Sequence, residues 1–122
     1  MELGNFSVSL AVKDLAVSRA FYEKFGFQVV GGDEAQNWLV LKSGFARIGI
    51  FQGMFEKNML TFNPRWNSDA QEMPGPDVRE IQRQLKDAGV TLDPEVDESK
   101  PGPGYFMAVD PDGNPILVDQ HV

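Results

Sequence analysis

Residues 105–119 have the sequence YFMAVDPDGNPILVD, in which the turn sequence Asp110-Pro-Asp-Gly-Asn114 separates two apolar runs. A turn of this kind between two strand-like runs is typical of a β-hairpin. Pro111 presets φ for the turn, and Gly113 can take a positive φ at little cost. We therefore expect a hairpin here that closes the C-terminal part of the fold.

The composition is ordinary for a soluble globular protein, with 42% hydrophobic and 24% charged residues among 122. The net charge of −7 disfavours nucleic acid as a partner. The absence of Cys excludes disulfides, thiolate nucleophiles and Cys-bound metals. No apolar run approaches the length of a membrane span, and the N-terminus lacks the features of a signal peptide. We therefore expect a cytoplasmic protein without membrane partners.

The first half of the chain predicts one strand, one helix and three further strands. The first strand, at residues 6–12, alternates between apolar and small side chains, which gives it two unlike faces. Asp14 can cap the next helix, which we expect to begin at Leu15 and to end before Gly26. The side chains on its expected buried stripe share helical spacing: Leu15, Ser18, Tyr22 and Phe25. The remaining strands are expected at residues 27–30, 37–42 and 46–51.

The second half repeats this order of elements. The two helix caps, Asp14 and Asp77, lie 63 residues apart (77 − 14), and the glycines that would end the helices have the same spacing. An internal repeat is the best single explanation. The segment 65–76 is an insertion relative to the first half, and we expect an ordered loop over a site or an interface. The expected elements are a strand at 59–63, a helix at 77–88, a short strand at 90–92 and the hairpin.

These features together resemble the vicinal oxygen chelate superfamily, which includes glyoxalase I, extradiol dioxygenases, fosfomycin-resistance proteins and bleomycin-resistance proteins. The residues that carry the resemblance are Asp14-Leu15, Ser18, Phe21-Tyr22, Gly26-Phe27 and Asp110-Pro-Asp-Gly-Asn114. The resemblance implies an α+β fold in which two βαβββ modules form a curved mixed sheet around a cavity. It also implies a single domain over residues 1–122, with module one at about 5–51 and module two at about 59–120. A homodimer is expected by the same analogy.

Enzymes of this superfamily hold a divalent metal on the cavity face. The resemblance places the metal ligands at four positions of this chain: Ser7, Gly49, Met59 (or Asn58 if the register differs by one) and Leu117. None of the four has an imidazole or a carboxylate, which transition metals need as donors. The single His, His121, is expected to be solvated near the terminus. We therefore expect no metal cofactor, as in the metal-free bleomycin-resistance proteins.

Strand alternation predicts which side chains face the cavity. We expect seven of them to contact a ligand: Trp38, Arg47, Phe51, Asn63, Trp66, Tyr105 and Asp119. A mostly apolar face with few polar groups suits a planar or amphipathic small molecule. Other interpretations are open, since Trp38 and Phe51 can fill an interior or a subunit interface. Arg47 can be a surface charge, and Trp66 can be a lid or an interface residue.

Two functions from different classes remain. The first is a metal-free small-molecule-binding protein that sequesters an aromatic or cationic compound, as the resemblance to bleomycin-resistance proteins implies. The alternative is a lyase, an isomerase or a dioxygenase-like enzyme that uses Arg47, Asp119 or a displaced metal site. A perturbed carboxylate facing the cavity would favour the enzyme, whereas an inert aromatic groove would favour the binding protein. A third possibility is a closed pocket in a domain that serves only in interactions.

Overall fold

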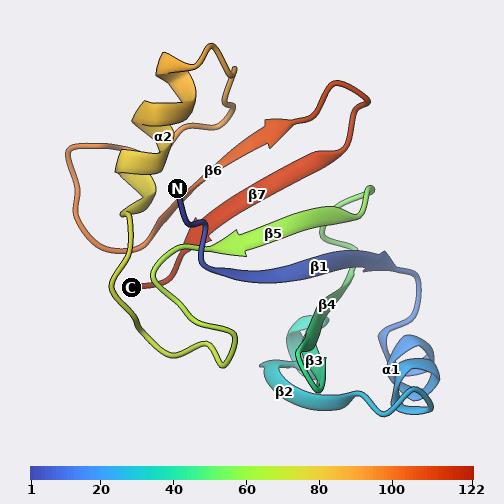
Figure 1. Cartoon of the computed structure of the whole chain (residues 1–122). Helices are drawn as coiled ribbons and strands as arrows, with labels where there is room; N and C mark the ends of the chain where they lie inside the picture. Colours follow the sequence, from blue (N-terminus) through green and yellow to red (C-terminus); the bar gives the residue numbers. More distant parts are fainter. The chain divides into compact units, whose positions relative to one another are not determined.

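The computed structural model describes all residues, 1–122, and the chain divides into two compact units. The N-terminal unit comprises Ser7–Met59, and the C-terminal unit comprises Met1–Phe6 together with Leu60–Val122. Each unit combines one α-helix with several strands, which Figure 1 shows in the colours of the sequence. The mixed α+β class is therefore as expected. Neither α-helix is long and apolar enough to cross a membrane.

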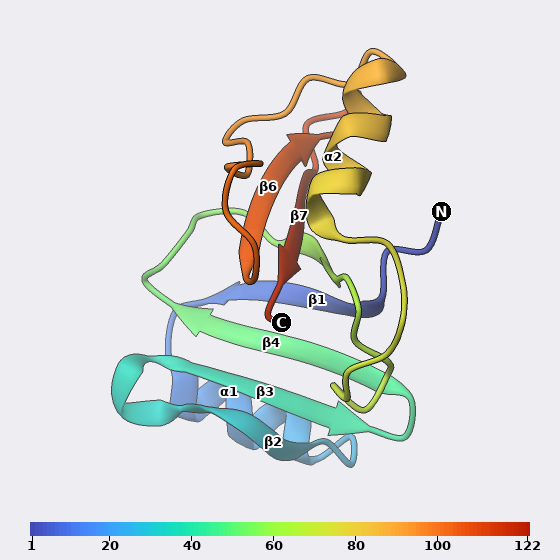
Figure 2. The same cartoon turned by 90° about the vertical axis from the view of Figure 1, so that its left-hand side faces the viewer.

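The N-terminal unit is a four-stranded sheet with a helix on one face. Its strands lie in the order β2-β3-β4-β1, with β1 parallel to β4 and the other neighbours antiparallel. A short 3-10 helix, η1, precedes β3, and Figure 2 shows α1 behind β2 and β3. The elements are β1 (Asn5–Val12), α1 (Leu15–Glu23), β2 (Gln28–Asp33), η1 (Glu34–Gln36), β3 (Trp38–Ser43) and β4 (Ala46–Gln52).

The core of this unit forms where the apolar faces of the strands meet α1. Leu39 pairs with Ile50 and Leu41 pairs with Ile48, so these four side chains share the face that α1 covers. Leu15 is buried against them from the first turn of the helix. The alternation predicted from the sequence is therefore confirmed in β3 and β4.

The predicted buried stripe of α1 is wrong at its C-terminal end. The helix ends at Glu23, and Phe25 lies beyond it with 66% of its surface exposed. The chain turns at Gly26, whose φ is +90°, and Phe27 takes the inward position next to Tyr22. The helix thus ends two residues before Phe25, with Lys24 as its C-cap, so Gly26 lies one residue beyond the C′ position predicted for it.

This difference predicts unequal costs for two substitutions in the same segment. Leu15→Ala is expected to lower the free energy of unfolding by about 2–5 kcal/mol, because it leaves a cavity in the core. Phe25→Ser is expected to change it by less than about 0.5 kcal/mol, because the ring is already exposed. Urea unfolding of both variants measures the difference, and similar losses would show that Phe25 is buried in solution.

The C-terminal unit is a three-stranded sheet with α2 along one face. The strand order is β5-β7-β6, with β5 parallel and β6 antiparallel to β7. Figure 1 and Figure 2 both show α2 beside β6 and β7. The elements are β5 (Met59–Asn63), α2 (Val78–Asp87), β6 (Gly104–Val109) and β7 (Pro115–Gln120). The buried core consists of Val78, Ile81, Leu92, Phe106 and Val118.

The strand expected at residues 90–92 does not form, although Leu92 is buried in the core. The chain after α2 instead follows β6 through two backbone hydrogen bonds. The N–H of Asp93 donates to the carbonyl of Met107, and the N–H of Met107 donates to the carbonyl of Pro94. The apolar pattern thus predicted the burial of Leu92 correctly but not its backbone conformation.

The hairpin predicted at the C-terminus is confirmed as β6 and β7. The Asp110 carboxylate accepts the N–H groups of Asp112 and Asn114, and the side-chain amide of Asn114 donates to the same carboxylate. These hydrogen bonds hold the pKa of the Asp110 carboxyl below its ordinary value. The acidic residues of this turn therefore stabilise the turn itself, and Gly113 has the positive φ, +88°, that the turn requires.

Candidate functional site

The sheet of the N-terminal unit has a second face, opposite α1, that carries most of the predicted ligand-contacting residues of this unit. Trp38 pairs with Phe51, Val40 with Gly49 and Lys42 with Arg47 across β3 and β4. Paired residues of antiparallel strands share a face, so Trp38, Arg47 and Phe51 lie on the same side of the sheet. The structure therefore brings these three predicted residues onto one surface.

Aromatic rings dominate this face. The Trp38 and Phe51 rings are stacked, with centroids 6.0 Å apart and planes inclined by 4°. Phe55 adds a third ring, whose centroid lies 5.3 Å from that of Phe51. Stacked and tilted rings at such distances attract one another and present broad apolar surfaces. The arrangement can contact a flat organic molecule.

The Phe51 ring also covers Gly49, one of the four positions where the resemblance places a metal ligand. A Cβ atom on Gly49 would lie 2.5 Å from Cε2 of Phe51, which is closer than real Cβ atoms approach other atoms. No side chain fits at Gly49 while the ring keeps this position. The place of a metal donor is thus taken by an aromatic ring.

The other three positions also lack donors for a transition metal. Ser7 precedes Ser9, the partner of Gly49, by two residues on β1, so it lies on the same face. Leu117 pairs with Thr61, and alternation along β5 puts Met59 on the face of Thr61. No group of three or more His, Cys, Asp or Glu side chains is placed to hold a metal ion. These residues therefore do not fit a transition-metal centre.

The sheet of the C-terminal unit carries three of the four remaining predicted residues, Asn63, Tyr105 and Asp119, on its face opposite α2. Tyr105 and Asp119 are directly paired across β6 and β7. Asn63 is buried, and its Nδ2 donates to the backbone carbonyl of Asp119 at 2.9 Å. Its Oδ1 accepts from Nδ2 of Asn5 at 3.3 Å. The Asn63 amide is thus engaged within the protein, and it holds the strand that presents Asp119.

Trp66 lies in the loop between β5 and α2, and this loop is ordered, as predicted. The N–H of Trp66 donates to the carbonyl of Asn63, and Trp66 forms an isolated β-bridge with Glu72. The N–H of Met73 donates to the carbonyl of Arg65 at 2.8 Å, which closes the loop. The backbone at Trp66 is therefore held by contacts on both sides.

His121 is exposed, as expected, but its imidazole also makes two specific contacts. Its imidazole is stacked on the Trp66 indole, with centroids 4.6 Å apart and planes inclined by 18°. Its Nε2 lies 3.5 Å from Oδ2 of Asp119. The preceding residue, Gln120, is fully buried, which fixes the backbone from which His121 extends. Sequence spacing gave no signal for this group, because Trp66 and His121 are brought together only by the fold.

The Asp119 carboxyl has an altered pKa. Its burial raises the pKa above the ordinary value for aspartate, and the positive charge of a protonated His121 opposes this rise. A half-buried carboxylate of this kind favours a cation as its neighbour. Asp119 is therefore the ionisable group on this face that is best placed to bind a cation or to transfer a proton.

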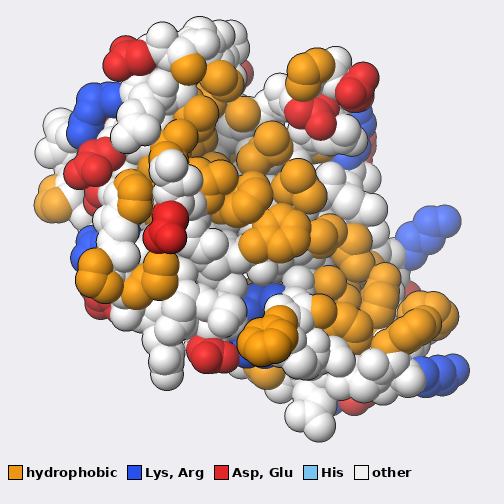
Figure 3. Space-filling view, in the orientation of Figure 1, with side chains coloured by type: hydrophobic (Ala, Val, Ile, Leu, Met, Phe, Trp, Pro, Cys, Tyr) orange, Lys and Arg blue, Asp and Glu red, His pale blue; other side chains and the backbone are white.

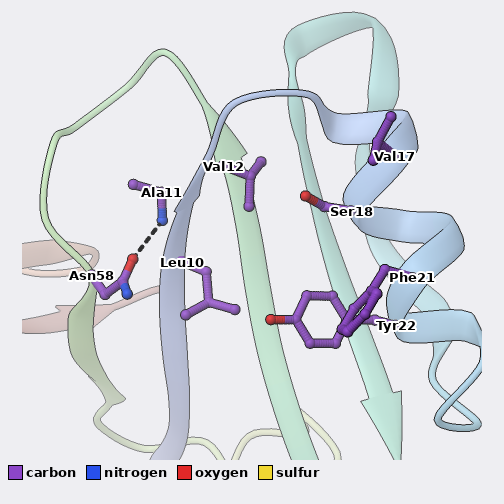
Figure 4. Close-up of a pocket in the computed structure, with 8 residues that line it drawn as sticks. All are labelled: Leu10, Ala11, Val12, Val17, Ser18, Phe21, Tyr22 and Asn58. Carbon is purple, nitrogen blue, oxygen red and sulfur yellow. Dashed lines mark hydrogen bonds between the residues drawn. The ribbon is translucent and has the colours of Figure 1, made fainter.

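A groove that the sequence did not predict lies between β1 and α1 of the N-terminal unit (Figure 4). It has a volume of about 320 Å³, and Figure 4 shows the Tyr22 hydroxyl pointing across it towards Leu10. Val17 and Phe21 are exposed on α1, Phe25 is exposed just beyond its end, and Figure 3 shows hydrophobic side chains at the surface of this helix. Because α1 has apolar residues on both of its sides, the hydrophobic pattern alone could not tell which side lies at the surface.

Comparison with known proteins identifies a family model and solved structures that match this chain. A model of the Glyoxalase/Bleomycin resistance protein/Dioxygenase superfamily matches residues 6–118. A solved structure of a member of this superfamily from Vibrio splendidus 12B01 is 14% identical, with a TM-score of 0.66 over 95% of this chain and 97% of that one. No curated protein matches the chain by sequence.

Two further solved structures are similar over nearly their whole length. One, described as NAD-dependent benzaldehyde dehydrogenase from Legionella pneumophila, is 19% identical, with a TM-score of 0.71 over 96% of this chain and 99% of that one. The other, a bleomycin-binding protein complexed with bleomycin, is 24% identical, with a TM-score of 0.33 over 93% of this chain and 95% of that one. At these identities the structures from Vibrio splendidus and Legionella pneumophila bear on the fold alone, whereas the match to the bleomycin-binding protein is too weak to bear on it.

Proposed function

Because this chain belongs to the glyoxalase/bleomycin resistance protein/dioxygenase superfamily, we propose that it binds an organic small molecule without a bound transition metal. One observation carries the proposal. At Gly49, where the resemblance places a metal ligand, the Phe51 ring occupies the space that a donor side chain would need. An aromatic ring in the place of a metal-donor side chain favours contact with an apolar molecule over metal chemistry.

The chemistry of the two faces supports an aromatic or cationic ligand. Trp38 and Phe51 provide stacked rings in the N-terminal unit. Trp66, Tyr105 and Asp119 combine aromatic surface with a carboxylate in the C-terminal unit. The net charge of −7 adds a long-range attraction for cations. Two polar residues complete the proposed ligand contacts: Arg47 and Asn63.

Elemental analysis combined with native mass spectrometry tests the proposal. Protein purified without chelators is expected to contain far less than one transition-metal ion per chain. Native mass spectra are expected to show an organic ligand that is retained, or one that binds on screening against aromatic amines and related compounds. A stoichiometric transition metal that survives dialysis would overturn the metal-free assignment.

Gly49→Ala provides a direct test of the aromatic face. The added Cβ is expected to displace the Phe51 ring, because the two would otherwise be 2.5 Å apart. The stack with Trp38 is then lost, so the Trp38 fluorescence should change and ligand affinity should fall about tenfold or more. Fluorescence is measured in protein in which Trp66 is replaced by Phe, so that Trp38 is the only tryptophan, whereas ligand affinity is measured with Trp66 in place. Gly75→Ala is the matched control, because a Cβ there meets nothing within 4 Å and, as at Gly49, the backbone φ is not positive.

One observation favours the enzyme alternative, and that is the raised pKa of Asp119. A carboxyl group whose pKa is raised by burial accepts a proton more readily than an ordinary aspartate, as a general base requires. A lyase or isomerase would use it in that way. Deuterium exchange into the retained ligand, lost in Asp119→Asn, would support this alternative, and its absence in the unmodified protein would exclude it.

We also propose that the chain forms a homodimer. The exposed side chains of Val17 and Phe21 on α1, and of Phe25 just beyond its end, support an apolar interface, since such residues are unfavourable in water when they form a contiguous patch. Light scattering of the chain, compared with the double variant Phe21→Ser/Phe25→Ser, tests this. A monomeric mass for the unmodified chain at micromolar concentration would contradict it.

A further inference from the structure

The residues around His121 form a small site that is already filled by the protein itself. The imidazole lies between the Trp66 indole, 4.6 Å away by ring centroids, and the Asp119 carboxylate, 3.5 Å from its Nε2. A carboxylate beside an aromatic face is an arrangement that binds organic ammonium groups, because the ring quadrupole and the negative charge attract the same cation. A protonated imidazole meets the same two requirements.

We propose that Asp119 and Trp66 form a binding site for an organic ammonium ion, and that His121 occupies this site until such a ligand displaces it. The inference rests on the proposed function, since it names a ligand class and a means of regulation for part of the same face. It differs from that proposal in assigning a role to His121.

The two walls of the site are held independently of His121. Asp119 belongs to β7, where it pairs with Tyr105, and its backbone carbonyl accepts a hydrogen bond from Asn63. The backbone at Trp66 is fixed by its N–H bond to Asn63 and by its bridge to Glu72. Removing the imidazole should therefore leave in place the strand that carries Asp119 and the loop backbone that carries Trp66.

The imidazole itself is held more loosely than the walls. His121 follows the last residue of β7, and 45% of its side chain is exposed. Its side chain contacts Trp66 and Asp119. Rotation about its Cα–Cβ bond uncovers both walls without any change in the strand. By contrast, Asp119 is half-buried and gains from any cation that replaces the imidazole.

Choline and its uncharged analogue 3,3-dimethyl-1-butanol provide a matched pair of probes. Binding is followed by the fluorescence of Trp66 in protein in which Trp38 is replaced by Phe. His121→Ala is expected to bind choline about tenfold more tightly than the parent protein, because no imidazole has to be displaced. The double variant His121→Ala/Asp119→Asn is expected to lose that gain, and the uncharged alcohol is expected to bind weakly to all of them.

His121→Phe is the control for occupancy, since its ring can keep the stack on Trp66. It is expected to bind choline no better than the parent protein. Equal choline affinity in the parent and His121→Ala proteins, or equal binding of choline and the alcohol, would overturn the inference. Either result leaves the proposed function standing if the protein still binds an organic ligand without metal. A stoichiometric metal would overturn the proposed function whatever the choline result.

Discussion

Replacing Gln120 by Ala is expected to lower the free energy of unfolding by about 3–5 kcal/mol, because the hydrogen bonds of a buried amide are lost. Its Oε1 accepts the N–H of Val78, the first residue of α2. The two hydrogens on its Nε2 are shared among three acceptors, which are Oδ2 of Asp77 at 3.0 Å and the backbone oxygens of Gly102 at 3.3 Å and Val122 at 2.8 Å. A buried donor or acceptor without its partner is costly, and Ala also leaves a cavity.

The charge on Asp77 makes this loss larger. Burial alone would raise the pKa of the Asp77 carboxyl, but hydrogen bonds from Arg79 and Gln120 outweigh that effect and hold the pKa below its ordinary value. Asp77 is therefore ionised at neutral pH, and its bond with Gln120 is charge-assisted, which roughly doubles its strength. Asp77 also caps α2 by accepting the N–H of Arg79.

Urea unfolding monitored by circular dichroism measures the effect of Gln120→Ala. Gln84→Ala removes the same side chain from an exposed position on α2, so it is expected to change the free energy of unfolding by less than about 0.5 kcal/mol. A loss below about 1 kcal/mol for Gln120→Ala would mean that water replaces its hydrogen bonds. In that case the amide would not be buried in solution.

Gly4→Ala is expected to destabilise the C-terminal unit by about 3–5 kcal/mol, or to detach the segment before β1 from it. Gly4 has a φ of +83°, which an L-residue adopts only with strain. A Cβ at this position would also lie 1.9 Å from the backbone carbonyl oxygen of Asn63. Backbone cannot give way as a flexible side chain can, so Leu3 would be pulled from the core against which it packs.

Gly113→Ala separates the strain of a positive φ from the steric clash with the backbone of Asn63. Gly113 has nearly the same φ, +88°, but a Cβ there would meet nothing within 4 Å. Its expected cost is the conformational strain alone, about 1–2 kcal/mol. Thermal unfolding of both variants gives the comparison. Equal losses would show that the contact between Gly4 and Asn63 does not contribute, and that only φ matters at both sites.

The elements that the sequence predicted well are those whose cause is local. The Asp110–Asn114 turn, the caps at Asp14 and Asp77 and the alternation in β3 and β4 all depend on residues within one short segment. The resemblance to the vicinal oxygen chelate superfamily, which these residues carry, implied the glyoxalase/bleomycin resistance fold. The errors have a different origin, because they depend on packing between segments.

Phe25 and Leu92 illustrate those errors. Either Phe25 or Phe27 could fill the space next to Tyr22, and only the position of Gly26 in three dimensions decides between them. Leu92 has the burial of a strand residue, but its segment is tied to β6 at Met107 and does not form a continuous ladder. Tertiary contacts override local preference in both places.

The candidate site could be predicted only in part. The resemblance and strand alternation together indicated the faces that carry Trp38, Phe51 and Asp119, since alternation has a strict period of two. Nothing in the sequence indicated that the Phe51 ring lies over Gly49. The stacking of His121 on Trp66 was equally hidden, because it joins a loop to the residue that follows a distant strand.

The position of Phe51 over Gly49 has a consequence for how this chain could change its chemistry. A His or Glu at position 49 clashes with the ring, and removal of the ring alone supplies no donor. A metal-binding descendant would therefore need at least two substitutions, and each one alone would damage the aromatic surface before any metal could bind. The Phe51 ring in its present position and a donor side chain at position 49 cannot be present together. A single substitution in this stretch of β4 would therefore disturb the aromatic surface without creating a metal site.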